Sequence, residues 1–316
     1  SGDFAMEGTK PMQWFRNILF VSRGSEDERN ALKQALSLAR NHQATLTAVI
    51  VCPEVPREME PYRDRLHDSL RRDLDRAIDH ACDAVELDRA DVPVTMDVEF
   101  SSAPFVHVVQ RVLRDEHDLV IKEVESGSDR RGFRAFDMHL LRKCPCPVWL
   151  CRPISRSQNE IRVGVAVDAD SAESAGHDLS VRLLRLAGSL AETCNGRLEI
   201  ISCWEVVFED YLRHNPWAEI PGDEVQQVIA GAQRDRRAQL QALVAESGIE
   251  SRLQVHQVRG RPSEAIPEQV EELEIDILVM GTVARTGIPG LIIGNTAENI
   301  LQKLGCTLLA LKPVGF

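Results

Sequence analysis

The chain has 316 residues, of which 43% are hydrophobic and 27% charged, a balance typical of globular rather than disordered proteins. Lys and Arg number 37 against 49 Asp and Glu, so the net charge is −12, which disfavours a nucleic-acid surface built on clustered basic residues. No apolar run approaches the ~18 residues of a membrane-spanning helix, and residues 1–10 lack the pattern of a secretory signal. We therefore expect a cytoplasmic protein with no membrane span and no nucleic-acid partner, whose eight Cys residues are reduced thiols.

Strands and helices alternate along the first half of the chain. An apolar run without helical period predicts a buried strand at 17–22, and Ser25 is then predicted to cap a helix with apolar residues at 3.6-residue spacing. Further strands are predicted at 44–52, 94–100, 119–122 and 148–151. Further helices are predicted at 62–85, 104–115 and 137–142.

The second half follows the same order. Its strands are predicted at 162–167, 198–203, 252–258, 277–280 and 307–311. Its helices are predicted at 174–192, 224–247, 263–273 and 295–304. This alternation predicts two tandem, doubly wound, Rossmann-like α/β domains, each with a mainly parallel five-stranded sheet flanked by helices.

The two halves also share sequence landmarks in the same order, which indicates a tandem duplication. The matching pairs are 18–21 with 163–166, Pro104 with Pro262, 118–121 with 276–279, and 140–153 with 300–313. Residues 158–160 form the natural joint, so we predict domains at 13–157 and 160–316. In sheets of this kind ligands bind beyond the carboxyl ends of the strands, where the strand order reverses.

A glycine-rich loop follows the strand that ends at Met280. Four glycines lie between positions 281 and 294, and a helix begins near Asn295, which together with Glu298 resembles a capping box. Glycine amides can approach a ligand closely and a helix N-terminus offers unpaired N–H groups, so this stretch predicts a phosphate cradle to which Arg285 adds a positive charge. The pattern is neither a Walker loop nor a dinucleotide fingerprint, and on glycine count alone a surface turn is an equal interpretation.

These residues resemble the universal stress protein family, whose nucleotide-binding members carry Gly-x-x-Gly, nine residues, and then Gly-Ser/Thr. Gly281 matches the first glycine and Gly294 the last, whereas Ala284 replaces the second glycine and Asn295, followed by Thr296, replaces the Ser or Thr. The stretches Gly-Thr-Val-x-Arg-Thr-Gly and Gly-Asn-Thr-Ala-Glu are similar to the second half of tandem E-type members. The resemblance covers about residues 13–314.

The resemblance also implies where a nucleotide would bind. The family places an acidic residue after the first strand, against the adenosine end of the nucleotide; Asp168 matches it in the second half, while Arg23 holds that position in the first. The first half carries Glu-Val-Glu-Ser-Gly at 123–127 in place of the glycine loop, and its carboxylates would repel a polyphosphate. The nucleotide-binding residues implied in the second half are Ala166, Asp168, Met280, Gly281, Thr282, Arg285, Thr286, Gly287, Gly294, Asn295 and Thr296.

The function implied is that of a stress-response ligand-binding or regulatory protein that takes ATP or ADP, with Mg, or a related small phosphorylated ligand. Ala284 costs about 1 kcal/mol if its position requires a positive φ, which favours weak nucleotide binding or another phosphorylated ligand. In the family the last strand of the domain pairs across a two-fold axis. The resemblance therefore implies an intramolecular pseudo-dimer, with a homodimer as a further assembly, and it names no protein partner.

Two alternative functions stay open. In the first, the protein is a carrier or protein-interaction scaffold for a lipid or sugar-nucleotide ligand, with the glycine loop a relic; residues 208–222 favour it as a lid or partner surface. In the second, it is an enzyme with slow ATP hydrolysis or autophosphorylation. The sequence shows no positioned general base, so no catalytic residue is predicted.

Two further features favour structural roles. Cys144-Pro145-Cys146 could suggest a metal, but Cys146 has a repeat partner, Cys306, in a half without companion thiols, so no metal site is predicted. Trp204, which follows a predicted strand near the ligand side, is interpreted as packing rather than as a platform for a base.

Overall fold

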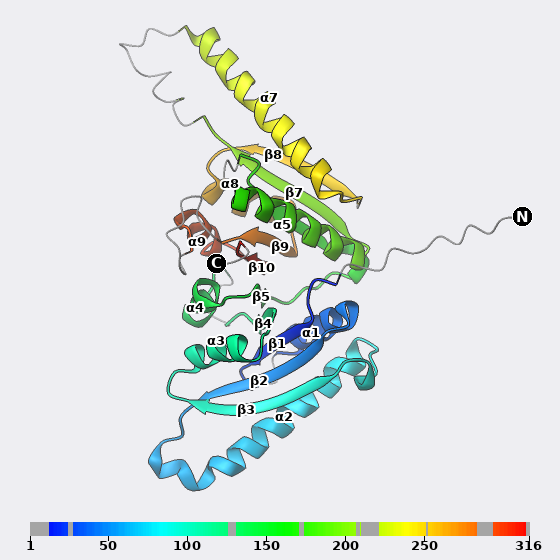
Figure 1. Cartoon of the computed structure of the whole chain (residues 1–316), viewed down its shortest axis with the longest axis vertical. Coiled ribbons are helices and arrows are strands. Elements are labelled where there is room, and N and C mark those ends of the chain that lie inside the picture. The colour runs from blue at the N-terminus through cyan, green and yellow to red at the C-terminus, as the bar shows by residue number, and fades with distance from the viewer. Residues whose placement is uncertain are drawn as a thin grey trace, which may run out of the picture. The chain divides into compact units, whose positions relative to one another are not determined.

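The computed structural model describes residues 13–24, 28–125, 131–170, 174–206, 209, 221–250, 252–282 and 293–313. The chain divides into two compact units, of which the first ends at Ile121 and the second begins at Lys122. Figure 1 labels the elements of both. The predicted α/β fold class is confirmed, because parallel strands alternate with helices in each unit.

In the first unit, strand β2 lies between β1 and β3 and pairs parallel with both. Helices α1 and α2 pack against each other, while α3 packs on β2 and β3 (Figure 1). Short 3₁₀ segments at Arg57–Tyr62 and Arg89–Asp91 precede and follow α2. The elements are β1 (Asn17–Ser22), α1 (Arg29–His42), β2 (Thr45–Pro53), α2 (Arg63–Ala84), β3 (Val94–Ser101), α3 (Pro104–Arg114) and the first residues of β4 (Leu119–Glu123).

The second unit contains a run of parallel strands in the order β8-β7-β6-β9-β10. Strand order reverses at β6, which lies between β7 and β9, so the crevice for a ligand is expected at the carboxyl ends of β6 and β9. The elements are α4 (Ala135–Lys143), β5 (Val148–Cys151), β6 (Arg162–Ala166), α5 (Ser174–Thr193), β7 (Arg197–Trp204), α7 (Gly222–Ser247), β8 (Leu253–Arg259), α8 (Pro262–Glu272), β9 (Ile277–Gly281), α9 (Asn295–Leu301) and β10 (Thr307–Leu311).

Helices cover this sheet in pairs. Helix α5 packs on β6, β7 and β9 and also against α7, while α8 packs against α9 and β7 (Figure 1). The central strands are enclosed as a result, and every residue of β10 is buried. Buried parallel strands of this kind explain the continuous apolar runs in the sequence, which show no alternation.

Strand β10 has a second partner. Besides its parallel pairing with β9, it pairs antiparallel with β5, so that Leu309 lies opposite Trp149. This is the pairing of closing strands that the sequence resemblance implied. It also groups residues 122–151 with the second unit, so the compact units do not coincide with the predicted domains 13–157 and 160–316, whose bounds stay a prediction.

One repeat landmark has a direct structural reason. The carboxylate of Asp118 accepts hydrogen bonds from the backbone N–H groups of Arg16, at 2.7 Å, and Asn17, at 3.0 Å. The carboxylate of Asp276 accepts one from the backbone N–H of Arg162 at 2.9 Å. Each aspartate therefore accepts from backbone N–H groups at the start of the neighbouring strand, β1 or β6. Because these donors need a partner, an aspartate precedes both β4 and β9.

Most predicted element ends agree with the structure to within a few residues. Pro104 and Pro262 occupy the first turn of α3 and α8, as the repeat comparison predicts. Helix α1 begins at Arg29 with Glu28 as N-cap and no side-chain cap, while Ser25 lies outside the described residues. Helix α9 ends at Leu301, earlier than predicted, because the chain turns before β10.

Two buried histidines make the stability of the first unit sensitive to acid. Burial lowers the pKa of His42 and of His117 below the usual value near 6.5. The unfolded chain therefore binds more protons than the folded chain just below this pH, and stability falls as pH falls through 6.5 towards 5. Replacing both residues, His42→Gln with His117→Gln, should flatten this acid loss, measured as urea midpoints at pH 7 and pH 5. An equal acid loss in the double variant would contradict the assignment; His80→Gln, on the exposed side of α2, is the control.

Candidate functional site

The carboxyl ends of β6 and β9 bring several predicted residues to one edge. Ala166, at the end of β6, lies beside Met280 on β9, and both side chains are buried. Val167 and Asp168 continue from β6, while Gly281 and Thr282 continue from β9. The five predicted residues at 166, 168 and 280–282 therefore gather at the point where strand order reverses.

Asp168 is held in a tight turn at this edge. Its Oδ1 accepts a hydrogen bond from the backbone N–H of Asp170 at 3.1 Å, the geometry of an Asx turn. Its backbone carbonyl accepts a hydrogen bond from the Ser180 hydroxyl of α5 at 3.2 Å. Asp170 in turn forms an ion pair with Arg236 of α7. These contacts fix a half-buried carboxylate where the resemblance places its ligand-binding acid.

The two ends of the glycine-rich loop meet at the same edge. The backbone N–H of Gly294 donates to the carbonyl of Thr282 at 3.0 Å, and the backbone N–H of Thr282 donates to the carbonyl of Leu311 at 3.0 Å. Thr282 is only 1% exposed and its hydroxyl lies 3.4 Å from that same carbonyl. The side chain of Thr282 therefore contacts the end of β10, and its backbone carbonyl anchors the far end of the loop at Gly294.

The predicted residues Arg285, Thr286 and Gly287 lie outside the described residues, as does Ala284. The remaining predicted residues follow the loop. Gly294 precedes α9, and Asn295 and Thr296 begin this helix with exposed side chains. The described part of the structure thus brings together the anchors of the loop and the residues on either side of it.

The predicted capping box is wrong. Gly294 is the N-cap of α9, and no side chain caps the helix, because Asn295 is already its first helical residue. Glu298 instead forms an ion pair with Arg142 of α4. Helix α9 has seven residues, so its dipole offers little to an anion, and recognition of a phosphate would rest on the loop itself.

Gly281 has a packing role that the motif does not reveal. A Cβ at this position would lie 2.9 Å from Cδ2 of Leu179 on α5, closer than real Cβ contacts allow. A side chain at residue 281 would therefore displace the flexible end of Leu179. The first glycine of the motif thus has a packing contact in addition to whatever it does for a ligand.

The first repeat fills the position equivalent to Asp168 with an internal cluster. Glu28, which is buried, accepts hydrogen bonds from the Ser22 hydroxyl at 2.6 Å and from the backbone N–H of Arg23 at 2.7 Å. The guanidinium of Arg23 lies 3.4 Å from the same carboxylate. Arg23 therefore has a carboxylate partner from its own repeat.

The end of β4 is filled in a similar way. Lys122 is 2% exposed and Asp137 of α4 is fully buried, with Nζ and Oδ1 2.8 Å apart. Nζ also donates to the carbonyl of Glu123 at 2.9 Å, and Oδ2 of Asp137 accepts from the backbone N–H of Glu125 at 3.2 Å. Sequence reasoning considered only the carboxylates of this stretch and missed Lys122, whose place within an apolar strand was the available signal.

The interpretation of Trp204 as a packing residue is confirmed. Its ring is buried in a cluster with Val225 and Ile229 of α7, and the guanidinium of Arg259 lies 5.7 Å from the ring centroid. Of the predicted lid at 208–222, Glu209, Pro221 and Gly222 are described, and the rest lies outside the described residues.

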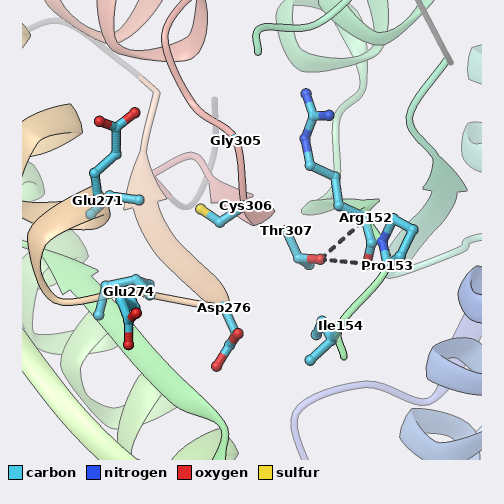
Figure 2. A pocket seen from close by; sticks show the side chains of 11 residues that line it. Arg152, Pro153, Ile154, Glu271, Glu274, Asp276, Gly305, Cys306 and Thr307 are labelled. Carbon is cyan, nitrogen blue, oxygen red and sulfur yellow. Dashed lines mark hydrogen bonds between the residues drawn. The ribbon is translucent and has the colours of Figure 1, made fainter. Parts of the chain in front are cut away.

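A pocket of about 250 Å³ lies at the opposite end of the strands from the predicted nucleotide site (Figure 2). Asp276 and Thr307, at the amino ends of β9 and β10, are part of its lining. The hydroxyl of Thr307 accepts from the backbone N–H of Arg152 at 2.9 Å and lies 3.2 Å from its carbonyl. None of the predicted nucleotide-binding residues lines this pocket. Its other lining residues are Pro153, Ile154, Val270, Glu271, Glu274, Ile275, Gly305 and Cys306.

Among the described residues, no group of three or more His, Cys, Asp or Glu side chains could hold a metal ion. Among the helices described, none is both long and apolar enough to cross a membrane.

Comparison with known proteins covers both repeats. The model of the universal stress protein family matches residues 15–152 and 162–312. Universal stress protein E of Photorhabdus laumondii is 27% identical over 311 residues, 96% of each chain, and that of Escherichia coli K12 is 28% identical over 310 residues, 96% of this chain and 95% of the relative. A crystal structure of a protein of unknown function from Pseudomonas aeruginosa PAO1 has the same fold, with a TM-score of 0.71 at 24% identity over 96% of this chain and 95% of that one.

The packing role of Gly281 can be tested by a double-mutant cycle. Gly281→Ala should lower the free energy of unfolding by about 1 kcal/mol, because the added methyl group displaces the flexible end of Leu179. In a Leu179→Ala background the same change should cost less, since the opposing atoms are gone. Urea denaturation of the four proteins measures the coupling. Gly231→Ala, in open space on α7, is the control and should not destabilise; additive costs at 281 and 179 would refute the contact.

The buried pair of Lys122 and Asp137 makes a second prediction. Asp137→Ala should lower the free energy of unfolding by about 3–5 kcal/mol, because it leaves a buried ammonium without its partner. The double variant Lys122→Met, Asp137→Leu should recover most of this loss. Glu60→Ala, which removes the exposed partner of Arg63, should cost less than about 1 kcal/mol. Denaturant midpoints measure all three, and a double variant as unstable as Asp137→Ala would show that the charges are not coupled.

Proposed function

Because the chain belongs to the universal stress protein family, a stress-response family, we propose that its second repeat binds ATP or ADP, or a related small phosphorylated ligand, as a regulatory domain. The proposed site is the edge where β6 and β9 end. The protein is expected to act in the cytoplasm as a binding protein rather than as a dedicated enzyme.

One observation carries this proposal. The hydrogen bond from the N–H of Gly294 to the carbonyl of Thr282 fixes both ends of the glycine-rich loop at the edge where Asp168 is held. A loop whose ends are already closed loses less conformational freedom when it takes a ligand, which favours binding. The proposed phosphate contacts, from loop amides and from Arg285, Thr286 and Gly287, extend this argument beyond the described residues.

The chemistry of the described residues fits a nucleotide. The half-buried carboxylate of Asp168 can accept hydrogen bonds from ribose hydroxyls or an adenine amino group. Ala166 and Met280 give the edge an apolar floor, and Asn295 and Thr296 leave two exposed polar side chains next to Gly294. A bound Mg would be held with the phosphates, so we assign it no protein ligand here.

The first repeat is not proposed as a second site. Its equivalent strand ends hold the Arg23–Glu28 and Lys122–Asp137 contacts, both made by its own side chains. A nucleotide there would have to break a buried ion pair before it gained any contact, at a cost of several kcal/mol. We therefore expect one nucleotide per chain.

The first experiment is mass spectrometry of whatever small molecule is released when the purified protein is denatured, followed by calorimetric titration with ATP and Mg. We expect ATP or ADP, or binding of added ATP. Asp168→Ala should weaken that binding about 10- to 100-fold, because a charged hydrogen-bond acceptor is lost. Arg23→Ala, at the equivalent position of the first repeat, is the matched control and should leave the affinity unchanged.

Other outcomes would redirect the function. Recovery of an acylated or sugar-linked molecule, with no heat from ATP, would support the carrier alternative and make the loop a relic. Turnover of ATP that disappears in a Gly294→Val variant would support an enzyme. Equal affinity of wild type and Asp168→Ala would refute the site.

A further inference from the structure

Two thiols face each other where α4 leads into β5. Cys144, the C-cap of α4, is fully buried, and Cys146 is half-buried. Their sulfur atoms are 3.6 Å apart, in hydrogen-bond contact but not bonded covalently. The second repeat cannot form this contact, because it has Leu304 and Cys306 at the matching positions.

The backbone holds the two thiols together. Pro145 lies between them and Pro147 follows, so two of the φ angles in this short turn are fixed by pyrrolidine rings. Cys144 has an extended backbone, φ −67° and ψ 129°, the region favoured by a residue before proline. A disulfide of about 2.05 Å needs a further approach of the two sulfur atoms by roughly 1.5 Å.

A half-buried cation lies beside the pair. Nζ of Lys312, just beyond β10, donates to the carbonyl of Cys144 at 2.7 Å and to that of Arg142 at 3.2 Å. These carbonyls end a helix, and the negative end of a helix disfavours a thiolate. The positive charge of the Lys312 ammonium offsets this unfavourable effect of the helix end on a thiolate of the pair.

The charge environment separates this pair from the other thiols. The hydrogen bond from Cys146, with the nearby Lys312 ammonium, lowers the pKa of the Cys144 thiol. Burial instead raises the pKa of Cys194 and of Cys203 to about 11, and that of Cys306 to about 12. Thiolate rather than thiol is the nucleophile, so these three residues are expected to be inert.

We propose that Cys144 and Cys146 form an oxidant-reactive dithiol, with a hydroperoxide as the substrate class and an intramolecular disulfide as the product. Cys146 is the half-buried member, so it is the sulfur that an incoming oxidant reaches. Cys144, fully buried and in contact with it, is the resolving thiol. A lone thiol would stop at a sulfenic acid, whereas a partner at 3.6 Å allows the reaction to finish.

The chemistry balances in two steps. One proton leaves the pair to solvent, and the contact between the two sulfurs lets the remaining proton lie on Cys144 while Cys146 reacts as the thiolate. The Cys146 thiolate attacks one peroxide oxygen; an S–O bond forms, the O–O bond breaks, and the departing hydroxide takes a proton from solvent as water. The Cys144 thiol then attacks the sulfenic sulfur; an S–S bond forms, the S–O bond breaks, and hydroxide leaves with the Cys144 proton as a second water. Overall, two thiols and hydrogen peroxide give one disulfide and two waters.

A bound metal is the other use of two neighbouring thiols. Soft metal sites in proteins usually require more than two protein ligands, and the described residues supply no group of three or more candidate ligands. The observations therefore favour reaction of the thiols with each other.

The test uses the whole, fully reduced protein and hydrogen peroxide. After brief exposure, free thiols are alkylated under denaturing conditions and the tryptic peptide 144–156, which runs through the uncleaved Arg152–Pro153 bond, is sequenced by mass spectrometry. We expect this peptide to lose two hydrogens, with Cys144 and Cys146 protected from alkylation and Cys151 still alkylated. The pair should react at least about tenfold faster than Cys52, a half-buried thiol whose pKa is raised by burial.

Variants test the role of each group. Cys144→Ser should leave Cys146 as a sulfenic acid that dimedone traps, while Cys151→Ser, the matched control in the same peptide, should react as wild type does. Lys312→Met should slow the reaction about tenfold and Lys312→Arg should largely restore it, which a purely structural role would not require. A wild-type pair that oxidises no faster than Cys52, a disulfide that includes Cys151, or an unchanged rate in Lys312→Met would overturn the proposal.

Discussion

The position of β10 between two different strands is the constraint on which the second unit depends. Its parallel bonds to β9 continue the sheet of the second repeat, and its antiparallel bonds to β5 join residues from the first repeat to the same sheet. The carbonyl of Leu311, the last residue of β10, anchors Thr282, and the ammonium of the next residue, Lys312, binds the end of α4. One buried strand thus positions the base of the glycine-rich loop and the turn that carries the two thiols.

The two repeats carry different side chains at the same strand ends. In the second, the residues there include Ala166, which is buried, and Gly281, which packs against Leu179. In the first, Lys122 and Asp137 fill the equivalent space with a desolvated ion pair. A buried pair of this kind contributes little net stability compared with an apolar pair of the same volume, but it is costly to break. The first repeat therefore has a costly ion pair to break at the position where we propose that the second binds a ligand.

Much of the fold could be predicted from the sequence because the signals are local. Apolar runs, helical periods and the prolines at 104 and 262 each act within a few residues, and the structure has strands and helices where they indicate. The ends of elements were less accurate, since Gly294 rather than Asn295 caps α9 and the turn before β10 shortens that helix. A chain position cannot show which of two neighbouring polar residues lies inside the first turn.

The candidate site could be predicted only in part, because the signals in the sequence are local. Spacing could place Asp168 and Gly281 at one edge, because parallel strands end together. It could not show that Thr282 turns its hydroxyl to Leu311, or that Lys122 finds Asp137 through space. Side-chain pairing across elements depends on three-dimensional packing, and no periodicity in the chain encodes it.

The covalent joining of the two repeats has an evolutionary consequence. When identical domains associate as separate chains, every substitution appears on both sides of the interface, so each must remain compatible with itself. Here β5 and β10 pair within one chain and are free to differ, as Val148-Trp149-Leu150-Cys151 and Thr307-Leu308-Leu309-Ala310-Leu311 do. The two repeats can therefore diverge independently, and the buried Lys122–Asp137 pair and the two neighbouring thiols of the first repeat have no equivalent that the second must share.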